Sequence, residues 1–310
     1  SNVIFDSNFL GGTDNTGPEF FEGCEVVVSQ TVVNQRVAPC PLEPRSGAAT
    51  WIDGRLLVWV SSQHVQGVKD GFAGLAGVDA DQVRVMTPDV GGGFGAKIGV
   101  YSEELLLGPL ARAVGRPVRY RETRSESMMN LGHGRSQHQQ ITVGGQRDGR
   151  VTHLRLELTQ DSGGFAEIGT VLGALFTRGM ASAVYDIANI ESHCYSVVTN
   201  TTPVVAYRGA GRPEATAAAE RAMDLFAAEV GLDPADVRRI NLIPTFTEPH
   251  ATAAGQTYDV GDYEASLDAA LAAADYPALR AEQARRREAG DVVQLGIGVS
   301  VYVEITGGVG

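Results

Sequence analysis

The chain has 310 residues, a formal net charge of −12 and 38 glycines, and 43% of its residues are hydrophobic while 20% are charged. These proportions are typical of a globular protein with enough chain for a buried core, and they exclude an intrinsically disordered chain. No apolar run approaches the roughly 18 residues of a membrane-spanning helix, no signal peptide is visible, and the acidic balance argues against nucleic-acid binding as the main role.

The first half of the chain predicts short strands and helices. Asp53-Gly54 is a two-residue turn signal between apolar segments, which indicates a hairpin. Ser102 precedes Glu103 and Glu104, which favours a helix with Ser102 as its N-cap. The expected elements are, in chain order, a β-like stretch over 26–33, a hairpin over 51–60, a helix over 65–76, a strand over 83–86, a helix over 102–114 and a half-exposed strand over 116–124.

The second half predicts the same mixture. Pro213 at a helix start and Gly231 at its end match the usual helix boundaries, and Asp233 is an N-cap signal for a shorter helix. The expected elements are strands over 137–143 and 151–158, a loose glycine-rich loop over 161–173, a β region over 190–205, helices over 213–230 and 234–241, a helix or helix pair over 262–288, and a strand over 292–310. The irregular order predicts an α+β fold of mixed sheets with packed helices.

The segment GGGFGAK at 91–97 is the strongest local signal. Consecutive glycines before a helix let backbone N–H groups approach an anion or a flat ring system closely. A phosphate-binding Walker loop is excluded, because Ala96 precedes the lysine and Ile98 follows it. Ile98 also occupies the third glycine position of a dinucleotide fingerprint. A tight turn without a ligand remains the alternative interpretation.

The segment AYRGAGRPE at 206–214 is a second glycine-rich turn before a helix. Two such turns in one chain suggest two walls of one cofactor site, since each helix N-terminus favours negative charge such as phosphate. Arg208 and Arg212 add positive charge to this loop, although a solvated face is the alternative for both. Gln63 is a candidate buried amide donor, against the ordinary interpretation of an exposed loop glutamine.

Other residue types narrow the chemistry. Glu43 and Arg45 are expected to form a structural ion pair. The cysteines Cys24, Cys40 and Cys194 are expected to be buried structural thiols; three of them cannot supply the four thiolates of an ordinary iron–sulfur cluster. Their spacing suggests no disulfide framework, so a reducing, cytoplasmic location is expected. The histidines show no metal-binding spacing, and the common serine-nucleophile signatures are missing from the sequence.

Five segments together carry a family resemblance. They occur in the order EPR (43–45), SSQ (61–63), DVGGGFGAK (89–97), AYRGAGRPE (206–214) and GIGVSVYVEITGG (296–308). In this order they resemble the molybdopterin-binding large subunit of the xanthine dehydrogenase, aldehyde oxidase and carbon monoxide dehydrogenase family, the molybdenum hydroxylases. The similarity extends over nearly the whole chain and implies the molybdopterin-binding domain fold of that family.

The resemblance implies an enzyme that hydroxylates an aldehyde or an N-heterocycle with oxygen derived from water. Its cofactor would be molybdenum with molybdopterin, in the cytosine dinucleotide form usual in bacteria. Electrons would leave to a 2Fe-2S subunit and an FAD subunit in a heteromeric complex, which fits the low cysteine count of this chain. The remaining large-subunit polypeptide is a further expected partner.

The resemblance also implies roles for individual residues. Gln63 would contact the molybdenum oxo group, and Arg208 and the Phe94 loop would line the metal centre, so Gln63 and Arg208 are the implied catalytic positions. No side chain is expected to ligate the metal. The implied cofactor-binding positions are Gln63, Gly92, Gly93, Phe94, Gly95, Tyr207, Arg208, Gly209, Ala210 and Gly211.

Three departures from the family pattern bear on the substrate. Carbon monoxide dehydrogenases of the family hold copper through a cysteine at the position of Gly209, so the copper–molybdenum reaction is disfavoured. Xanthine-type enzymes carry a phenylalanine at the position of Ala210 and a glutamate at that of Ile98, so purine recognition is disfavoured. An aldehyde or a non-purine N-heterocycle is the favoured substrate class.

The resemblance divides the chain into three parts. Residues 1–243 would form the first molybdenum-cofactor-binding domain, 244–262 a polar connector, and 263–310 the truncated beginning of a second such domain. The family's catalytic glutamate lies near the end of that second domain, so the catalytic base is expected outside this chain, and Glu304 does not match it. The alternatives are a non-catalytic remnant that binds the pterin or a partner subunit, and an unrelated phosphate- or nucleotide-binding protein.

Overall fold

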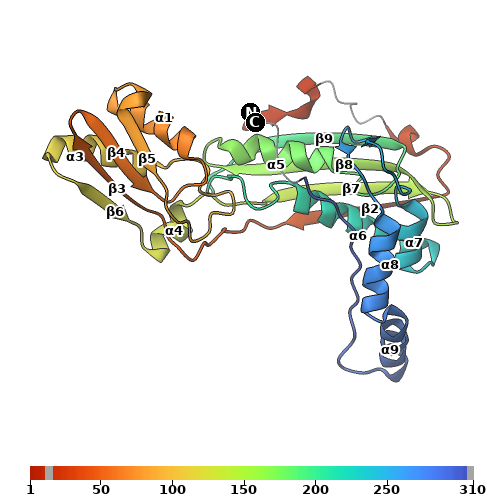
Figure 1. Cartoon of the computed structure of the whole chain (residues 1–310). Helices are drawn as coiled ribbons and strands as arrows, with labels where there is room; N and C mark the ends of the chain where they lie inside the picture. Colours follow the sequence, from red (N-terminus) through yellow and green to blue (C-terminus); the bar gives the residue numbers. More distant parts are fainter. Residues whose placement is uncertain (11–16, 306–310) are drawn as a thin grey trace.

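A computed structural model describes residues 1–10 and 17–305 of the chain. The fold is built on two large, separate β-sheets, and helices cover one face of each sheet (Figure 1). The larger sheet forms an elongated lobe with most of the helices, and the smaller sheet forms a second lobe beside it. The expected α+β fold of mixed sheets with packed helices is confirmed.

The larger sheet has five strands and is mixed. β8 and β9 run parallel, and every other neighbouring pair is antiparallel. Thirteen-residue β8 lies at the centre, and its inward-facing Leu154, Leu156 and Leu158 are each 1% exposed. The strands are, in order across the sheet, β1 (Val3–Asp6), β9 (Asn189–Val198), β8 (Val151–Gly163), β7 (Gln137–Gly145) and β2 (Val26–Asn34).

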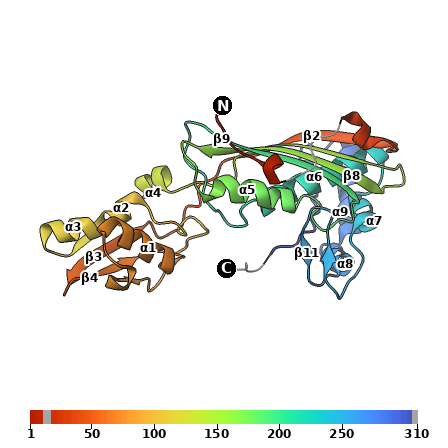
Figure 2. The ribbon, with the colours of Figure 1, turned by 90° about the horizontal axis from the view of Figure 1, so that it is seen from above.

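Two helices cover the same face of this sheet. Helix α5 (Ile168–Gly179) packs against β8 and β9, α6 (Arg212–Val230) packs against β2 and β7, and the helices contact each other (Figure 2). Helix α7 (Pro234–Asn241) is tied to α6 by buried Arg238, whose Nε donates to Glu220 Oε2 at 2.8 Å. The large core therefore lies between the sheet and α5–α7.

The smaller sheet has four strands, and β4 and β5 are its parallel pair. Helices α1 (Val65–Ala76) and α3 (Leu107–Val114) cover one face, where Phe72 and Leu56 are 0% exposed. The opposite face carries an open cavity, and no helix of the described residues covers it. The strands are, in order, β5 (Val83–Met86), β4 (Arg55–Val60), β3 (Ser46–Ile52) and β6 (Val118–Arg121).

The remaining elements connect the lobes or extend from the larger one. Helix α4 lies between β6 and β7, and α8 and α9 project from the larger lobe (Figure 1). The remaining helices are α2 (Ser102–Leu105), α4 (Arg124–Asn130), α8 (Tyr263–Ala273) and α9 (Tyr276–Ala289). The two-residue strands β10 (His250–Ala251) and β11 (Thr257–Tyr258) lie in the predicted connector.

Most expected elements are confirmed, including the hairpin around Asp53-Gly54 and the helix that ends at Gly231. The helix expected over 102–114 is interrupted between α2 and α3, because Pro109 has no N–H to donate to the preceding turn. Its N-cap is Tyr101, which has extended backbone angles, so the assignment of Ser102 as N-cap was wrong.

The prediction of a loose glycine-rich loop over 161–173 was wrong. β8 continues to Gly163, and α5 begins at Ile168. The glycines allow close packing there: a Cβ on Gly169 would lie 2.5 Å from the carbonyl oxygen of Val204. The residues are small because other backbone lies against them, and they do not form a loose loop.

The prediction of a strand over 292–310 was also wrong for the residues that the structure describes. Residues 292–305 form no strand with any described part of the chain, and 306–310 lie outside the described residues. Val301 is nevertheless buried in the large core, and Val299 and Val303 pack against that core.

Candidate functional site

The first glycine-rich loop has a backbone that few other residues tolerate. Gly92 and Gly95 have φ of +101° and +95°, and Phe94 between them has φ of +55°. A Cβ on Gly95 would lie 2.5 Å from the carbonyl oxygen of Ala206, which belongs to the second loop. Gly95 therefore permits both the left-handed turn and the close approach of the two loops.

The second loop has the same character. Gly209, Ala210 and Gly211 all have positive φ, at +91°, +42° and +104°. A Cβ on Gly211 would lie 2.3 Å from the carbonyl oxygen of Gly173 in α5, and the Gly211 N–H donates to Glu214 Oε2 at 2.9 Å. These contacts fix the loop at the start of α6.

The two loops touch directly. The backbone N–H of Arg208 donates to the carbonyl oxygen of Phe94 at 2.8 Å, so segments more than a hundred residues apart form one surface. The two glycine-rich loops are therefore adjacent, whereas their role as walls of a cofactor site stays a prediction. Phe94 remains 42% exposed and belongs to neither hydrophobic core.

Gln63 lies against the first loop and points one end of its amide away from it. Its Oε1 accepts from the backbone N–H of Gly95 at 2.8 Å and of Lys97 at 3.2 Å. A Cβ on Gly93 would lie 2.3 Å from this oxygen, so a larger residue there would displace the Gln63 side chain. Gln63 is exposed, not buried as one interpretation held, and its Nε2 has no hydrogen-bond partner in the described part of the chain.

The arginines around the second loop differ in how they are engaged. Arg212 lies over the Phe176 ring and bonds Glu304 at 3.1 Å, and Arg135 bonds the carbonyl oxygens of Tyr207 and Arg208. The exposed guanidinium of Arg208 has no hydrogen bond or ion pair with residues 1–10 or 17–305. It is a free cationic donor at the junction of the loops.

Two cavities border this junction. One, of about 600 Å³, lies between the second loop and the C-terminal segment, where Arg208 and Tyr302 line it. The other, of about 450 Å³, lies behind the first loop, where Gly95, Tyr101 and Ile168 line it. Each of the two loops therefore borders open space.

A buried charge cluster supports the first loop from behind, and sequence reasoning missed it. Arg45 does not pair with Glu43 as expected. Its guanidinium lies 2.7 Å from Glu122, contacts Glu103, and lies 3.9 Å from Glu104. Hydrophobic spacing gives no signal for this cluster, because Arg45 and its carboxylates at 103–104 and 122 come from three separate places in the chain.

Burial has the largest effect on the pKa of Glu104 in this cluster. Burial, together with repulsion from Glu103 and Glu122, raises the pKa of Glu104 to about 7, against the opposing effects of the Tyr101 N–H and of Arg45. Tyr101 stacks on Arg45 with 3.8 Å between the guanidinium carbon and the ring centroid, and its hydroxyl donates to the Ala96 carbonyl oxygen at 2.8 Å. The cluster is thus linked to the loop through Tyr101.

The cysteines do not follow the expectation of three buried thiols. Cys194 faces the core from β9 and is buried, which raises the pKa of its thiol to about 12. Cys24 is half-buried just before β2, and Cys40 is exposed in the segment before β3, because neither lies on an inward-facing strand position. Among the described residues, no cluster of three histidine, cysteine, aspartate or glutamate side chains has metal-binding geometry.

Comparison with known proteins assigns the chain to a family. Residues 3–242 match the molybdopterin cofactor-binding domain. The chain belongs to this family. It is 35% identical to the carbon monoxide dehydrogenase large chain of Hydrogenophaga pseudoflava and 33% identical to the nicotine 6-hydroxylase large subunit of Paenarthrobacter nicotinovorans, and each match covers 93% of this chain and 36% of the relative.

A solved structure agrees with the family assignment. Quinoline 2-oxidoreductase from Pseudomonas putida 86 superposes with a TM-score of 0.86 and 29% identity, over 94% of this chain and 37% of that chain. The chain therefore spans a little over a third of the length of these relatives. In the described part of the chain no helix has the length and apolar character needed to cross a membrane.

The residues at the loop junction fit a molybdopterin cofactor. Gly93, Gly95 and Gly211 form a cradle in which a Cβ would collide with neighbouring atoms. The Gln63 amide and the Arg208 guanidinium are unpaired donors, and donors of this kind match the oxo and phosphate oxygens of such a cofactor.

Proposed function

We propose that this chain is the molybdenum-cofactor-binding part of an oxidoreductase that hydroxylates an aldehyde or an N-heterocycle with oxygen derived from water. The observation that carries the proposal is the contact between the two glycine loops, where Arg208 N meets Phe94 O at 2.8 Å. This contact brings two unpaired donors, Gln63 Nε2 and the Arg208 guanidinium, to one junction that belongs to a molybdopterin-binding family.

The proposal gives each residue a limited task. Gln63 would donate its amide hydrogens to an oxygen on the metal, and Arg208 would supply positive charge beside it. Phe94, Tyr207 and Ala210 would shape the wall of the site. The glycines that would leave backbone accessible to the pterin are Gly92, Gly93, Gly95, Gly209 and Gly211. When bound, the cofactor supplies the two-electron oxidation of the substrate carbon.

The proposed substrate class depends on whether the second loop has room for a copper-binding cysteine. A Cβ on Gly209 would lie 2.5 Å from Pro213 Cδ, and φ at Gly209 is +91°, so this backbone has no room for a cysteine that could hold copper. We therefore favour oxidation of an aldehyde or a non-purine N-heterocycle over oxidation of carbon monoxide. The similarity to a nicotine hydroxylase and a quinoline oxidoreductase supports the heterocycle.

The wider assembly is part of the same proposal. We infer a cytosine dinucleotide form of the cofactor, and 2Fe-2S and FAD groups on partner subunits in a cytoplasmic complex. The relatives are themselves described as a large chain and a large subunit, which supports a multi-subunit assembly. We retain 1–243 as the first cofactor-binding domain, 244–262 as a connector and 263–310 as the start of a second domain.

The general base is proposed to lie outside this chain. Glu304 bonds Arg212 at 3.1 Å and faces the cavity beside the second loop, so its negative charge is already paired. This chain would then bind and orient the cofactor, and the proton would be removed by a group on the rest of the subunit.

The test is the composition and activity of the purified complex that contains this chain. We expect about one molybdenum and one pterin per chain, release of cytidine monophosphate on hydrolysis, and turnover of an aldehyde or an N-heterocycle with the label of ¹⁸O-water in the product. Gln63→Ala is expected to lower turnover strongly. A complex free of molybdenum and pterin would refute the proposal, and molybdenum without turnover would identify the non-catalytic alternative.

A further inference from the structure

Lys97, which ends the first glycine loop, is a fully buried cation. It is one of only two lysines in the chain, and its side chain is 0% exposed. Its Nζ lies 2.8 Å from Glu43 Oε2, 3.0 Å from the Glu43 carbonyl oxygen and 2.9 Å from Ser61 Oγ. All three ammonium hydrogens therefore have acceptors, which is the condition under which a buried cation is tolerated.

The carboxylate of Glu43 holds the other end of the loop. Its Oε2 accepts from the Gly91 N–H at 2.7 Å and from Ser61 Oγ at 2.7 Å, in addition to Lys97. Burial opposes ionisation of Glu43, but the bonds from Lys97, Ser61 and Gly91 outweigh it and hold the pKa of this carboxyl below its ordinary value. One carboxylate oxygen thus contacts both the first and the last residue of the loop.

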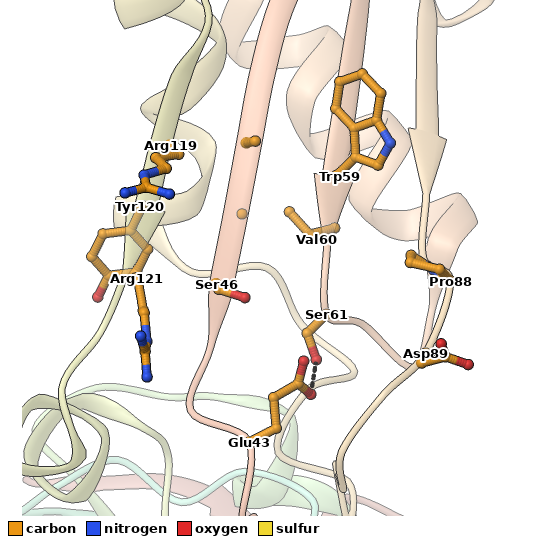
Figure 3. Close-up of a pocket in the computed structure, with 12 residues that line it drawn as sticks. Glu43, Ser46, Trp59, Val60, Ser61, Pro88, Asp89, Arg119, Tyr120 and Arg121 are labelled. Carbon is orange, nitrogen blue, oxygen red and sulfur yellow. Dashed lines mark hydrogen bonds between the residues drawn. The ribbon is translucent and has the colours of Figure 1, made fainter.

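Figure 3 shows where this pair meets solvent. Glu43 and Ser61 lie at one end of the open cavity of about 460 Å³ on the uncovered face of the small sheet. Glu43 is 30% exposed from this side, whereas Lys97 is enclosed. A change at Glu43 is therefore accommodated more easily than one at Lys97.

The backbone of Lys97 holds Gln63 at two points. The Gln63 N–H donates to the Lys97 carbonyl oxygen at 2.9 Å, and the Lys97 N–H donates to Gln63 Oε1 at 3.2 Å. Gly95 N donates to the same Oε1 at 2.8 Å. With its carbonyl oxygen occupied by the loop, the Gln63 amide presents its hydrogens on the opposite side.

We propose that Glu43 and Lys97 are a positioning pair for Gln63. By tying Gly91 and Lys97 to one carboxylate, the pair holds the loop in the conformation that occupies the Gln63 carbonyl and leaves its amide hydrogens for the cofactor. The inference rests on the proposed function, since the cofactor is what the amide would meet. A lysine suits this point because its ammonium places three donors around one atom, which the planar fork of arginine does not.

The experiment compares the holo-complex with variants Glu43→Gln and Lys97→Arg, and with Lys69→Met as control. Lys69 is the other lysine; it lies on α1 and has no ion pair in the described part of the chain. Hydrogen exchange of the Gly95 and Lys97 amides is expected to rise about tenfold or more in the first two variants. The paramagnetic resonance spectrum of their bound molybdenum is expected to shift as it does in Gln63→Ala, with no change in the control.

A purely structural role would lower thermal stability but leave the amide exchange and the molybdenum spectrum as in the wild type, and that outcome overturns the inference. If either single variant fails to fold, the double variant Glu43→Gln/Lys97→Met removes both charges together. We expect it to fold with the molybdenum spectrum still shifted; an unshifted spectrum would refute the inference. A wild-type complex without molybdenum contradicts the proposed function instead, and the amide exchange still decides the positioning role.

Discussion

We expect Glu104→Gln to stabilise the protein at neutral and alkaline pH and to have little effect near pH 4. Glu104 is 3% exposed and shares the Arg45 guanidinium with Glu103 and Glu122. Burial and the two neighbouring carboxylates raise its pKa from 4.5 to about 7. The folded protein therefore binds the Glu104 proton more tightly than the unfolded chain does.

The sign and size of the effect follow from this difference. A raised pKa in the folded state contributes stability that is fully present below the unfolded pKa and is lost as pH rises through the folded pKa. Between pH 4.5 and about 7 the loss amounts to about 3 kcal/mol for a rise in the pKa of Glu104 of this size. Glutamine has no proton to lose, and its Oε1 still accepts from the Tyr101 N–H that bonds Glu104.

Urea unfolding of both proteins between pH 4 and pH 8 measures the effect. The difference in free energy of unfolding should grow with pH across the window and level off above pH 7. Glu126→Gln is a control of opposite sign, because hydrogen bonds from Thr123 lower the pKa of Glu126, so its stabilisation is lost as pH falls. Parallel pH profiles of Glu104→Gln and the wild type would refute the reasoning.

Three further predictions concern the two loops. Arg208→Ala should reduce molybdenum retention or turnover much more than Arg212→Ala, because only Arg208 is unpaired; equal small effects would contradict its assignment. Gly95→Ala should cost at least about 1 kcal/mol of stability and separate the loops, whereas Gly99→Ala, with open space around it, should cost little in thermal unfolding. Gly209→Cys should destabilise the loop without acquiring copper, measured as metal content after reconstitution.

The sequence could predict elements whose signals are local. The turn pair Asp53-Gly54 sets a hairpin because both residues adopt positive φ, and the helix ending at Gly231 has a left-handed glycine cap. The adjacency of the two glycine loops could be predicted as well, because two such turns before helices indicate one shared site. Gln63 and Arg208 lie at that junction, although their roles there stay a prediction.

The support of the site could not be predicted, because it depends on distant partners. Arg45 was expected to pair with its near neighbour Glu43, yet it pairs with Glu103 and Glu122. Glu43 is taken by Lys97, which lies more than fifty residues away. Short sequence separation is a weak guide to ion pairing where α2 and the end of β6 bring other carboxylates to the same buried point.

The C-terminal segment shows that an alternating apolar pattern can predict which residues are buried without predicting that the segment pairs with another strand. Its valines alternate with polar residues, and Val301 is 7% exposed in the large core, with Val299 and Val303 packed against that core. Burial on alternate positions is therefore what the pattern predicts correctly. Pairing is a further requirement, because a strand needs a second backbone edge within hydrogen-bond distance. Residues 292–305 pair with no described strand, so this segment buries its alternate valines without joining a sheet.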